Sequence, residues 1–330
     1  MNAPSKTAPS NRVRIAILGA SGYTGVELLR LLANHPNADI AALTADRQAG
    51  KEIAEIYPHL ARLDLPRLGR IEDVDWSGID VVFCALPHGT TQEVIAGLPA
   101  SVKVVDLSAD FRLYDLDSYA EWYGHAHRAP DLQKEAVYGL TEIKRDDVRT
   151  ARLVANPGCY PTTAQLPLIP LLEAGAIGPD DIVIDSKSGV TGAGRSVRED
   201  MLFTEVQDGI NAYGVGKHRH TPEIEQGLSQ ALGRPVQVSF TPHLMPMNRG
   251  ILSTIYVRLN DGGTADSLRS LLAERYRGEP FVTVLPNGAV PATRHVRGSN
   301  HCFIGVAKDR RPGRAILVSV IDNLVKGASG

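Results

Sequence analysis

The sequence predicts an α/β protein with a doubly wound parallel sheet in its first half and a largely antiparallel sheet in its second half. In the first half, short β-branched runs alternate with helical periodicity, which is typical of a parallel sheet covered by helices. In the second half, residues 236–241, 250–258 and 281–285 are β-rich runs that predict the strands of the second sheet. A chain of 330 residues is also long enough for two domains of ordinary size.

Composition and charge exclude several functional classes. Hydrophobic residues make up 43% of the chain and charged residues 22%, as in globular proteins. The net charge of −2 and the absence of a long basic run argue against nucleic-acid binding. The longest apolar runs are shorter than the ~20 residues that span a bilayer, so no membrane partner is expected.

The N-terminus and the cysteines predict the cellular setting. Residues 1–11 lack the apolar core of a signal peptide and predict a disordered start. The three cysteines, Cys84, Cys159 and Cys302, are far apart and contain no CxxC pair. This pattern fits neither a disulfide framework nor a zinc site, and it suits a reducing cytoplasm.

The first glycine-rich turn predicts a dinucleotide site. The β-branched run 13–18 leads into the turn 19–25, and leucines at helical spacing follow as far as His35-Pro36. Glycines in this context allow a pyrophosphate to approach the start of a helix. The alternative is that they merely permit a turn. The predicted cofactor-binding residues of this segment are Gly19, Ser21, Gly22, Tyr23, Thr24 and Gly25.

The spacing GxxGxxG and the next strand indicate NADP rather than NAD. The strand 40–44 should end beside the adenine ribose, where an arginine accommodates a 2′-phosphate and an acidic residue binds a 2′-hydroxyl. The sequence has both Asp46 and Arg47 here, with Thr44 as an additional hydroxyl and Lys51 nearby. We therefore expect Thr44 and Arg47 to contribute to NADP binding.

Further strands are expected at 80–86, which contains Cys84 as inert core, and at 102–107. They extend the parallel sheet, whose cofactor lies at the carboxyl ends of the strands. The latter strand leads into the segment 108–112, which ends in Arg112.

Cys159 is the candidate nucleophile. It follows a Pro-Gly turn and precedes the apolar run 164–172, so it is expected at the start of a helix. An ordinary thiol is about 3% ionised at neutral pH, and a helix N-terminus should lower its pKa. The alternative is a turn cysteine without a chemical role.

The segments that follow contain candidate anion-binding and proton-transferring residues. The strand 181–186 leads into a glycine-rich loop ending in Arg195, which suits phosphate or carboxylate binding unless the loop is only a mobile connector. His218 and His220 alternate, so both point to one side of an extended segment, and Glu223 opens the next helix. No further ligands at metal-binding spacing follow, so no metal is expected and a general acid or base is favoured. The alternative is a pair of solvated histidines.

The remaining charged residues and histidines have no motif that indicates a specific function. Arg249, at the end of the expected loop 242–249, is either a second anion contact or a surface residue. Asp322 is expected to cap a final helix. The remaining histidines have no partner motif and are expected on the surface or in the core. They are His35, His59, His88, His125, His127, His243, His295 and His301.

Taken together, these segments resemble the N-acetyl-γ-glutamyl-phosphate reductase family of the semialdehyde dehydrogenase superfamily. The resemblance covers nearly the whole chain, and the combination of ANPGCYPT with HRHTPEI is its most specific part. Aspartate-semialdehyde enzymes resemble the chain in architecture, but their cysteine and histidine motifs differ. The matching segments are GASGYTG, VDLSADFR, WYGHAH, AVYGLTEI, ANPGCYPTT, SGVTGAGR, HRHTPEIEQ and FTPHLMPMNRGI.

The resemblance implies an NADPH-dependent reduction of N-acetyl-L-glutamyl 5-phosphate to the 5-semialdehyde and phosphate in arginine biosynthesis. It implies a thioester on Cys159, with His218 as the expected acid or base and His220 and Glu223 orienting it or the substrate. The residues expected to hold the phosphate or carboxylate of the substrate are Ser188, Arg195 and Arg112. The alternatives are a reductase of an aspartyl or aminoadipyl phosphate, and a non-catalytic NADP-binding redox sensor.

The resemblance also implies the domain organisation. A Rossmann-type NADP-binding domain is expected over 12–158, and an α+β catalytic and dimerisation domain over 159–304. Residues 305–330 should return to the nucleotide domain. Members of the family continue beyond DNLVKGASG with a longer helical tail, so this segment is expected to be shortened and no cofactor contact is assigned to it. A homodimer or homotetramer is expected.

Overall fold

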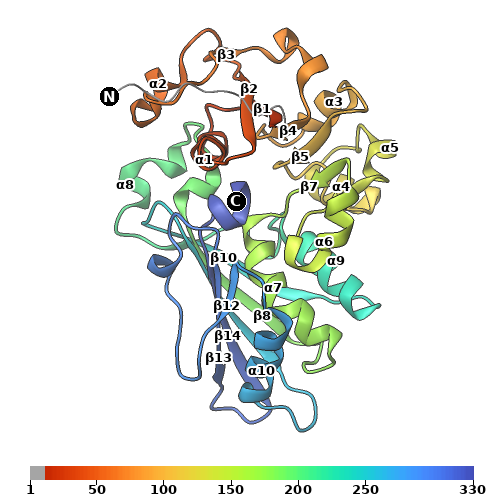
Figure 1. Cartoon of the computed structure of the whole chain (residues 1–330). Coiled ribbons are helices and arrows are strands. Elements are labelled where there is room, and N and C mark those ends of the chain that lie inside the picture. Colours follow the sequence, from red (N-terminus) through yellow and green to blue (C-terminus); the bar gives the residue numbers. More distant parts are fainter. Residues whose placement is uncertain (1–11) are drawn as a thin grey trace.

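The computed structural model describes residues 12–330, so the predicted disordered start 1–11 lies outside the described residues. The chain forms two sheets with their associated helices, one above the other in Figure 1. The first half of the chain, coloured red to yellow-green, forms the upper part of this view. The end of the chain lies between the two parts.

The first sheet is entirely parallel, as predicted, with strand order β3-β2-β1-β4-β5-β7-β6. Its strands are β1 Val13–Leu18, β2 Ala38–Thr44, β3 Leu68–Gly69, β4 Val81–Cys84, β5 Lys103–Asp106, β6 Ala136–Tyr138 and β7 Leu153–Ala155. Its α-helices are α1 Tyr23–Leu32, α2 Ile53–Ile56, α3 Thr91–Ala96, α4 Leu116–Tyr123, α5 Pro130–Gln133 and α6 Thr141–Thr150. Short 3₁₀ helices occur at Pro58–Leu60, Ile71–Asp73 and Trp76–Gly78.

Alternating side chains of β1 explain why this sheet is covered on both faces. Ile15 and Ile17 pack into one hydrophobic cluster, while Ala16 and Leu18 pack into another on the opposite face. Cys84 on β4 is fully buried in the second cluster, which confirms its predicted place in the core. The chain order reverses between β1 and β4, and such a switch point is where doubly wound folds bind their ligands.

The second sheet is mixed, with strand order β12-β13-β14-β11-β8-β10-β9. Two pairs, β8 with β10 and β12 with β13, are parallel, and the other four are antiparallel. The predicted mostly antiparallel sheet is therefore confirmed. Its strands are β8 Ile182–Gly189, β9 Asn211–Ala212, β10 Val238–Met245, β11 Ile251–Arg258, β12 Val282–Val284, β13 Cys302–Lys308 and β14 Arg314–Ile321.

Two predicted boundaries in this half are wrong. The expected loop 242–249 is shorter, because β10 continues to Met245 alongside β8. The expected return to the nucleotide domain at 305 starts too early, because β13 and β14 pair in the second sheet. Buried Ala315 and Leu317 hold β14 in the core of that sheet. Only after Ile321 does the chain turn to the π-helix η7 (Val325–Ser329), which packs against α1 and α7.

Helix α7 (Cys159–Glu173) is central to the second domain. Nearly all its side chains are buried, which explains why it has no amphipathic pattern. It packs against α9 (Thr221–Leu232), α10 (Ala265–Arg275) and the sheet. Short helices elsewhere are Val190–Ala193, Glu199–Met201, α8 Phe203–Val206 and Thr293–His295. Among residues 12–330, no helix has the length and apolarity needed to cross a membrane.

Candidate active site

The turn after β1 requires glycine at two positions. Gly19 has a φ of +76°, and a Cβ there would lie 2.3 Å from the carbonyl oxygen of Ala85. A Cβ on Gly25 would lie 2.4 Å from the carbonyl oxygen of Gly19. The backbone of this turn is therefore packed too closely for any other residue, as a close-approach phosphate turn requires.

The start of α1 fits the pyrophosphate of a dinucleotide. Gly22 is its N-cap and no side chain caps the helix, so first-turn N–H groups remain available to a ligand. Ser21, Gly22, Tyr23 and Thr24 are partly exposed at this point. The turn lies at the carboxyl ends of β1 and β4, where the strand order reverses. The predicted cofactor-binding segment therefore lies at the switch point of the sheet, where a dinucleotide is expected.

The end of β2 offers polar groups close to this turn. The backbone N–H of Ala20 donates to the carbonyl of Thr44 at 2.9 Å, which joins β2 to the turn. The hydroxyl of Thr44 is buried and has no hydrogen-bond partner in the described structure. Arg47 follows on the exposed surface. An unpartnered hydroxyl beside an exposed guanidinium suits the ribose end of a cofactor.

Arg195, which was expected near the substrate, and Arg249, for which two roles were open, both contact the nucleotide domain. Arg195 donates to the carbonyl of Ser21 at 3.4 Å and lies over the ring of Tyr57, so it belongs to the nucleotide turn. Arg249 is neither a free anion contact nor an ordinary surface residue. It forms ion pairs with Glu27 of α1 at 2.7 Å and with Asp322 at 3.6 Å, and so joins the two domains.

Ser188, another residue expected to hold the substrate, is buried on strand β8. Only 2% of the residue is exposed, and its hydroxyl donates to the carbonyl of Gly189 at 3.0 Å. It lies on β8 between Leu244 of β10 and Ile251 of β11. Two residues predicted to share one anion site are therefore apart in their contacts, since Ser188 is in the sheet and Arg195 is at the nucleotide turn.

Cys159 is the first residue of α7, as predicted from the Pro-Gly turn. Its N-cap is Gly158, whose N–H donates to Glu223 Oε1 at 2.7 Å. The carbonyl of Gly158 accepts from both the N–H and the hydroxyl of Thr162 at 3.0 and 2.9 Å. The backbone around the sulfur is thus held on both sides by the protein itself.

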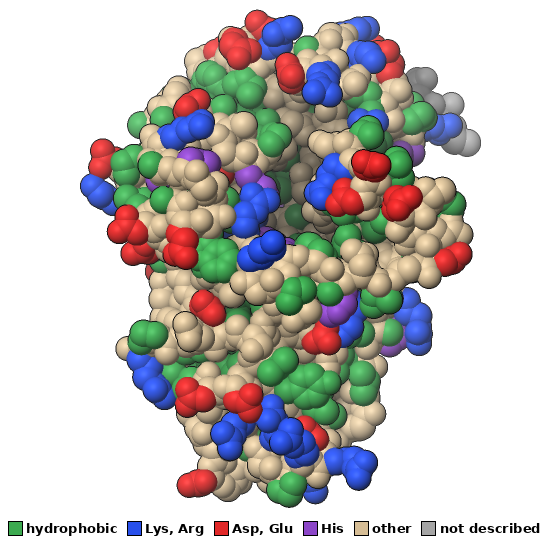
Figure 2. Space-filling view, turned by 180° about the vertical axis from the view of Figure 1, so that it is seen from behind, with side chains coloured by type: hydrophobic (Ala, Val, Ile, Leu, Met, Phe, Trp, Pro, Cys, Tyr) green, Lys and Arg blue, Asp and Glu red, His purple; other side chains and the backbone are tan. Residues whose placement is uncertain are grey.

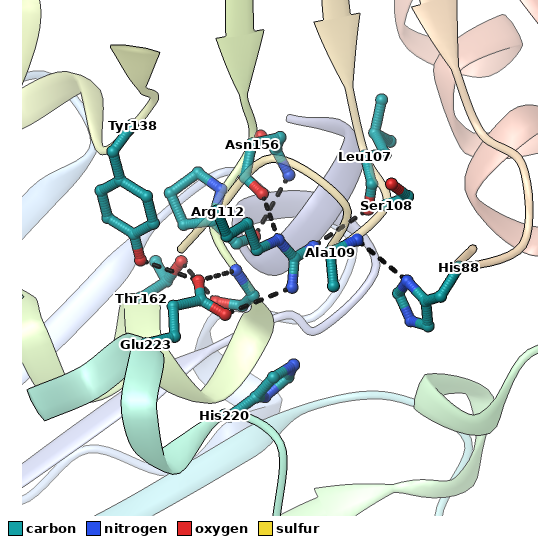
Figure 3. A network of polar contacts seen from close by, with 12 residues as sticks. His88, Leu107, Ser108, Ala109, Arg112, Tyr138, Asn156, Thr162, His220 and Glu223 are labelled. Atoms are coloured by element: carbon teal, nitrogen blue, oxygen red, sulfur yellow. Dashed lines mark hydrogen bonds and ion pairs between the residues drawn. The ribbon is translucent and has the colours of Figure 1, made fainter. Parts of the chain in front are cut away.

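The carboxylate of Glu223 is the centre of this polar network, shown in Figure 3. Its Oε1 also accepts from the hydroxyl of Tyr138 at 2.8 Å, and its Oε2 pairs with Arg112 at 3.4 Å. Arg112 in turn donates to the carbonyls of Asn156 and Leu107 at 2.8 and 3.0 Å. The exposed fractions of Glu223 and Arg112 are only 1% and 4%. Both residues therefore position the cysteine turn.

The predicted lowering of the thiol pKa is wrong for this structure. Burial raises the pKa of Cys159 to about 11, while Arg112 and backbone N–H groups at the start of α7 lower it and the charge of Glu223 raises it further. The residue keeps some contact with solvent, but the atoms around its sulfur remove most of the water. Loss of hydration outweighs the helix N-terminus here, because a thiolate depends strongly on water.

His220 is the imidazole that lies next to the cysteine. A Cβ built on Gly158 would lie 2.8 Å from its Nε2, and its ring centroid is 5.8 Å from that of Tyr160. His220 therefore contacts both chain neighbours of Cys159. Its Nδ1 is buried and has no partner among the described residues. Burial, followed by the charges of His218 and Arg112, holds the pKa of His220 well below its usual range, so the ring is neutral.

His218 contacts His220 and helps to hold it in place. Its Nδ1 accepts from the backbone N–H of His220 at 3.1 Å. Its ring packs against those of Tyr160, Tyr213 and Phe240 at 5.5, 5.3 and 5.4 Å. Burial and the neighbouring Arg219 lower the pKa of His218 to about 4. The geometry thus favours His220 over the expected His218 as the proton-transferring residue.

His88 also belongs to this site, although its sequence context predicted only a position on the surface or in the core. Its Nδ1 accepts from the N–H of Ala109 at 2.9 Å, which turns the ring as seen in Figure 3. The carboxylate of Asp110 holds the same loop by accepting from the N–H of Gly89 at 2.7 Å. Burial, Arg112 and Arg219 lower the pKa of His88 to about 4. The sequence did contain one signal for His88, namely its position shortly after the end of a strand of the parallel sheet, where ligands bind.

Arg219 was also missed, although it stands between the two predicted histidines. It is exposed, its guanidinium lies over the ring of Tyr123 at 5.3 Å, and its charge lowers the pKa of His88, His218 and His220. It is the cation of this site that stays open to solvent. Figure 2 shows a hollow between the two parts of the molecule with histidine and basic side chains at its rim. Within residues 12–330, no group of side chains suited to hold a metal is present.

Comparisons with known proteins agree with this arrangement. Residues 14–151 match the family model "Semialdehyde dehydrogenase, NAD binding domain", and residues 159–323 match "Semialdehyde dehydrogenase, dimerisation domain". The chain is 65% identical to the N-acetyl-gamma-glutamyl-phosphate reductase of Rhodospirillum rubrum over 326 residues, covering 97% of this chain and 93% of the relative. Its identity to the enzyme of that name from Afipia carboxidovorans is 62%, with the same coverage.

Solved structures with much lower sequence identity share the fold. Aspartate semialdehyde dehydrogenase II from Vibrio cholerae matches with a TM-score of 0.71 at 18% identity, over 96% of this chain and 95% of that one. Aspartate semialdehyde dehydrogenase with NADP from Candida albicans matches with a TM-score of 0.67 at 17% identity, over 96% of each chain. The two-domain architecture is therefore that of semialdehyde dehydrogenases.

Proposed function

The chain belongs to the N-acetyl-γ-glutamyl-phosphate reductase family of semialdehyde dehydrogenases, and from that premise we propose its reaction and mechanism. It reduces N-acetyl-L-glutamyl 5-phosphate to N-acetyl-L-glutamate 5-semialdehyde, with release of phosphate, through a thioester on Cys159. The observation that carries the mechanism is the position of His220 against both neighbours of Cys159. A thiol and a neutral imidazole at the start of one buried helix form an activated nucleophile.

The first step is acyl transfer to sulfur. Cys159 and His220 are both neutral at rest, because the thiol pKa is raised and the imidazole pKa is lowered. As the sulfur bonds to the acyl carbon, His220 accepts the thiol proton. The bond between that carbon and the phosphate oxygen breaks, and the proton passes to the leaving phosphate. Proton transfer by a positioned base contributes roughly 10²–10⁴-fold to such a step.

The second step regenerates the thiol. A nicotinamide cofactor, when bound, supplies the hydride that reduces the thioester carbon. The resulting thiohemiacetal oxyanion on Cys159 re-forms its carbonyl as the carbon–sulfur bond breaks, which releases the aldehyde and leaves a thiolate. His220 conducts a proton from solvent back to that sulfur. Its neutral form at pH 7 suits both directions of transfer.

Two pairs of cationic or polar residues suit recognition, one pair for the substrate and one for the cofactor. We assign the substrate phosphate to Arg219 and His88, since Arg219 is exposed and close enough to lower the pKa of that histidine. Arginine binds phosphate oxygens in two-point fashion. For the cofactor we assign NADP, with Arg47 and the unpartnered hydroxyl of Thr44 near its 2′-phosphate.

Assembly, location and pathway complete the proposal. A homodimer or homotetramer is supported by the description of the matching family model and by exposed apolar side chains. Four of these lie at Val197, Phe203, Ile210 and Val215, which are 93%, 74%, 56% and 59% exposed. All three cysteines are free thiols, which suits the cytoplasm. The product places the reaction in arginine biosynthesis.

The function is tested by running the reaction in reverse. The purified protein is mixed with N-acetylglutamate semialdehyde, phosphate and NADP, and formation of the reduced cofactor is followed by absorbance. We expect activity that requires phosphate and is much stronger with NADP than with NAD. Parallel assays with aspartate semialdehyde and aminoadipate semialdehyde serve as controls. Preference for one of these substrates would move the chain to a related reductase.

The same assay also distinguishes the proposed reductase from a non-catalytic redox sensor. Such a protein would bind NADP and oxidise Cys159 reversibly, but it would turn over none of the three semialdehydes. The buried His220 beside the cysteine speaks against it, because reversible oxidation needs no proton-transferring partner. Absence of turnover with all three substrates would contradict the proposed function.

A further inference from the structure

We propose that the segment Val325–Ser329 is a positioning element of the active site, with Gly327 as the residue that sets the place of Cys159. The inference deepens the proposed function and rests on it for its kinetic consequences. It starts from a contact between two residues that are far apart in sequence. A Cβ built on Gly327 would lie 2.7 Å from the Cβ of Cys159 and 3.1 Å from its Cα.

The contact is too close for any side chain at position 327. Distances under about 3 Å between carbon atoms require one of the two groups to move. The backbone of η7 thus forms a wall directly against the nucleophile, and Gly327 is buried there. Because the neighbouring atom is the Cβ of Cys159 itself, any displacement at this point is transmitted to the sulfur.

The segment is anchored so firmly that it can serve as a fixed wall. Before it, the carboxylate of Asp322 accepts from the N–H groups of Leu324 and Val325 at 2.8 and 3.1 Å. Asp322 therefore closes the turn that leads into the helix, whereas the N-cap itself is Leu324 and not Asp322 as predicted. Within the segment, Lys326 forms an ion pair with Glu142, and their side chains are only 9% and 3% exposed. A buried, paired charge is costly to displace.

The same segment also touches the nucleotide turn. The hydroxyl of Ser329 donates to the carbonyl of Thr24 in the first turn of α1 at 2.9 Å. Segment Val325–Ser329 packs against both α1 and α7, so it lies between the helix that starts at the nucleotide turn and the helix that starts at Cys159. It therefore fixes the relative position of the nucleophile and the cofactor site, on which hydride transfer depends.

The test is the variant Gly327→Ala. We expect kcat to fall about 100-fold, because a displacement of roughly 1 Å costs that much, while KM for NADPH stays within about threefold. In the absence of cofactor and substrate, the rate at which iodoacetamide alkylates Cys159 should also change by at least about threefold. Peptide mass spectrometry reports the modified cysteine. Wild-type kcat together with a wild-type alkylation rate in a folded variant would overturn the proposal.

Two further variants make the test specific to the contact. Gly97→Ala is the matched control, since its Cβ would meet only two backbone oxygens, Val94 O and Glu93 O, at an ordinary 3.5 and 3.7 Å, and we expect wild-type kinetics. A Cβ on Gly327 also lies 3.2 Å from Cδ1 of Ile321, and Ile321→Val removes that methyl group. The double variant Gly327→Ala/Ile321→Val should recover about tenfold in kcat over Gly327→Ala alone, because η7 gains room to move away from the sulfur. No recovery would contradict the steric account.

The design remains decisive if Gly327→Ala does not fold. Ser329→Ala removes only the link to Thr24 and should lower kcat about tenfold with little change in thermal midpoint, whereas an unchanged kcat would overturn the positioning role. The alkylation measurement needs no substrate. A wild-type chain without reductase activity would therefore refute the proposed function, while the alkylation rates would still test the role of Gly327.

Discussion

Two helix starts in this molecule follow the same sequence pattern and have different environments. Helix α1 and helix α7 each follow a strand of the first sheet and begin after a glycine N-cap without a capping side chain. At α1 residues 21–24 are partly exposed, while Gly19 and Gly25 are packed tightly against the backbone around the turn. At α7 the protein supplies its own anion, because Glu223 accepts the N–H of Gly158, and η7 closes the other side.

The difference teaches that a helix N-terminus has no fixed chemical effect. At α1 the available N–H groups and the positive end of the dipole suit a phosphate. At α7 the same dipole faces a carboxylate and a sulfur with little access to water, so the pKa of the thiol rises to about 11. In the proposed mechanism, Cys159 is therefore activated by proton transfer to His220 during the reaction rather than by a standing thiolate.

Replacing the nucleophile should give the largest effect, because it should abolish the chemistry at the start of α7 and leave NADPH binding at the start of α1 intact. We expect Cys159→Ser to lower turnover by at least about 10³-fold, because the thioester cannot form. Binding of NADPH should be unchanged, since the nucleotide turn is on a different helix. Steady-state kinetics and fluorescence titration with NADPH measure the two quantities. Substantial turnover in this variant would contradict covalent catalysis.

The two histidines should differ in their effect on turnover. His220→Ala removes the imidazole next to Cys159, and we expect a loss of about 10²–10⁴-fold in kcat. His218→Ala removes a ring that packs behind it and accepts from the N–H of His220, so a loss of about tenfold is expected.

Comparison of kcat at several pH values completes this test. Because the pKa of His220 is held well below its usual range, the wild-type rate should persist on acidification below pH 6.5 until that histidine is protonated. A larger loss with His218→Ala than with His220→Ala would reverse the assignment.

Much of the fold was predictable because it depends on local patterns. The β1 strand, the glycine turn and the periodic helix are adjacent in sequence, so their joint structure follows from side-chain spacing alone. The start of α7 at Cys159 was predictable for the same reason. The register of β13 and β14 in the second sheet is a long-range property, and the boundary at 305 was accordingly misplaced.

The environment of the site was much less predictable. Glu223, Tyr138 and Gly158 are far apart along the chain, and nothing in their local sequence indicates that they share one buried network. Arg195 follows a strand that suits anion binding, yet the fold carries it to the nucleotide turn. The pKa of Cys159 likewise depends on burial, which spacing alone does not report.

The nucleotide turn can be distorted by one methyl group, which tests the comparison from the α1 side. In Gly25→Ala the new Cβ would lie 2.4 Å from the carbonyl of Gly19, so the turn must open. We expect the Kd for NADPH to rise about 10- to 100-fold, because the backbone can no longer approach the pyrophosphate. The alkylation rate of free Cys159 should stay near that of the wild type. Unchanged NADPH affinity by titration would place the cofactor elsewhere.

The smallest expected effect comes from a substitution that removes the negative charge at the start of α7, so that this helix start resembles that of α1. Glu223→Gln keeps an oxygen that accepts from Gly158 but removes the negative charge that raises the thiol pKa. The charge of Arg112 then acts on the sulfur without its carboxylate partner. We expect the pKa of Cys159 to fall by about one unit, which increases the thiolate fraction at pH 8 about tenfold.

The pH dependence of iodoacetamide alkylation measures this shift directly. In the wild type the rate should still be rising at pH 9, since the pKa of the thiol is about 11, and in Glu223→Gln the whole curve should move to lower pH. Cys84 and Cys302, both buried, serve as internal references in the same digest. A wild-type midpoint below pH 8 would mean that the dipole of α7 prevails over burial, and the contrast between the two helix starts would disappear.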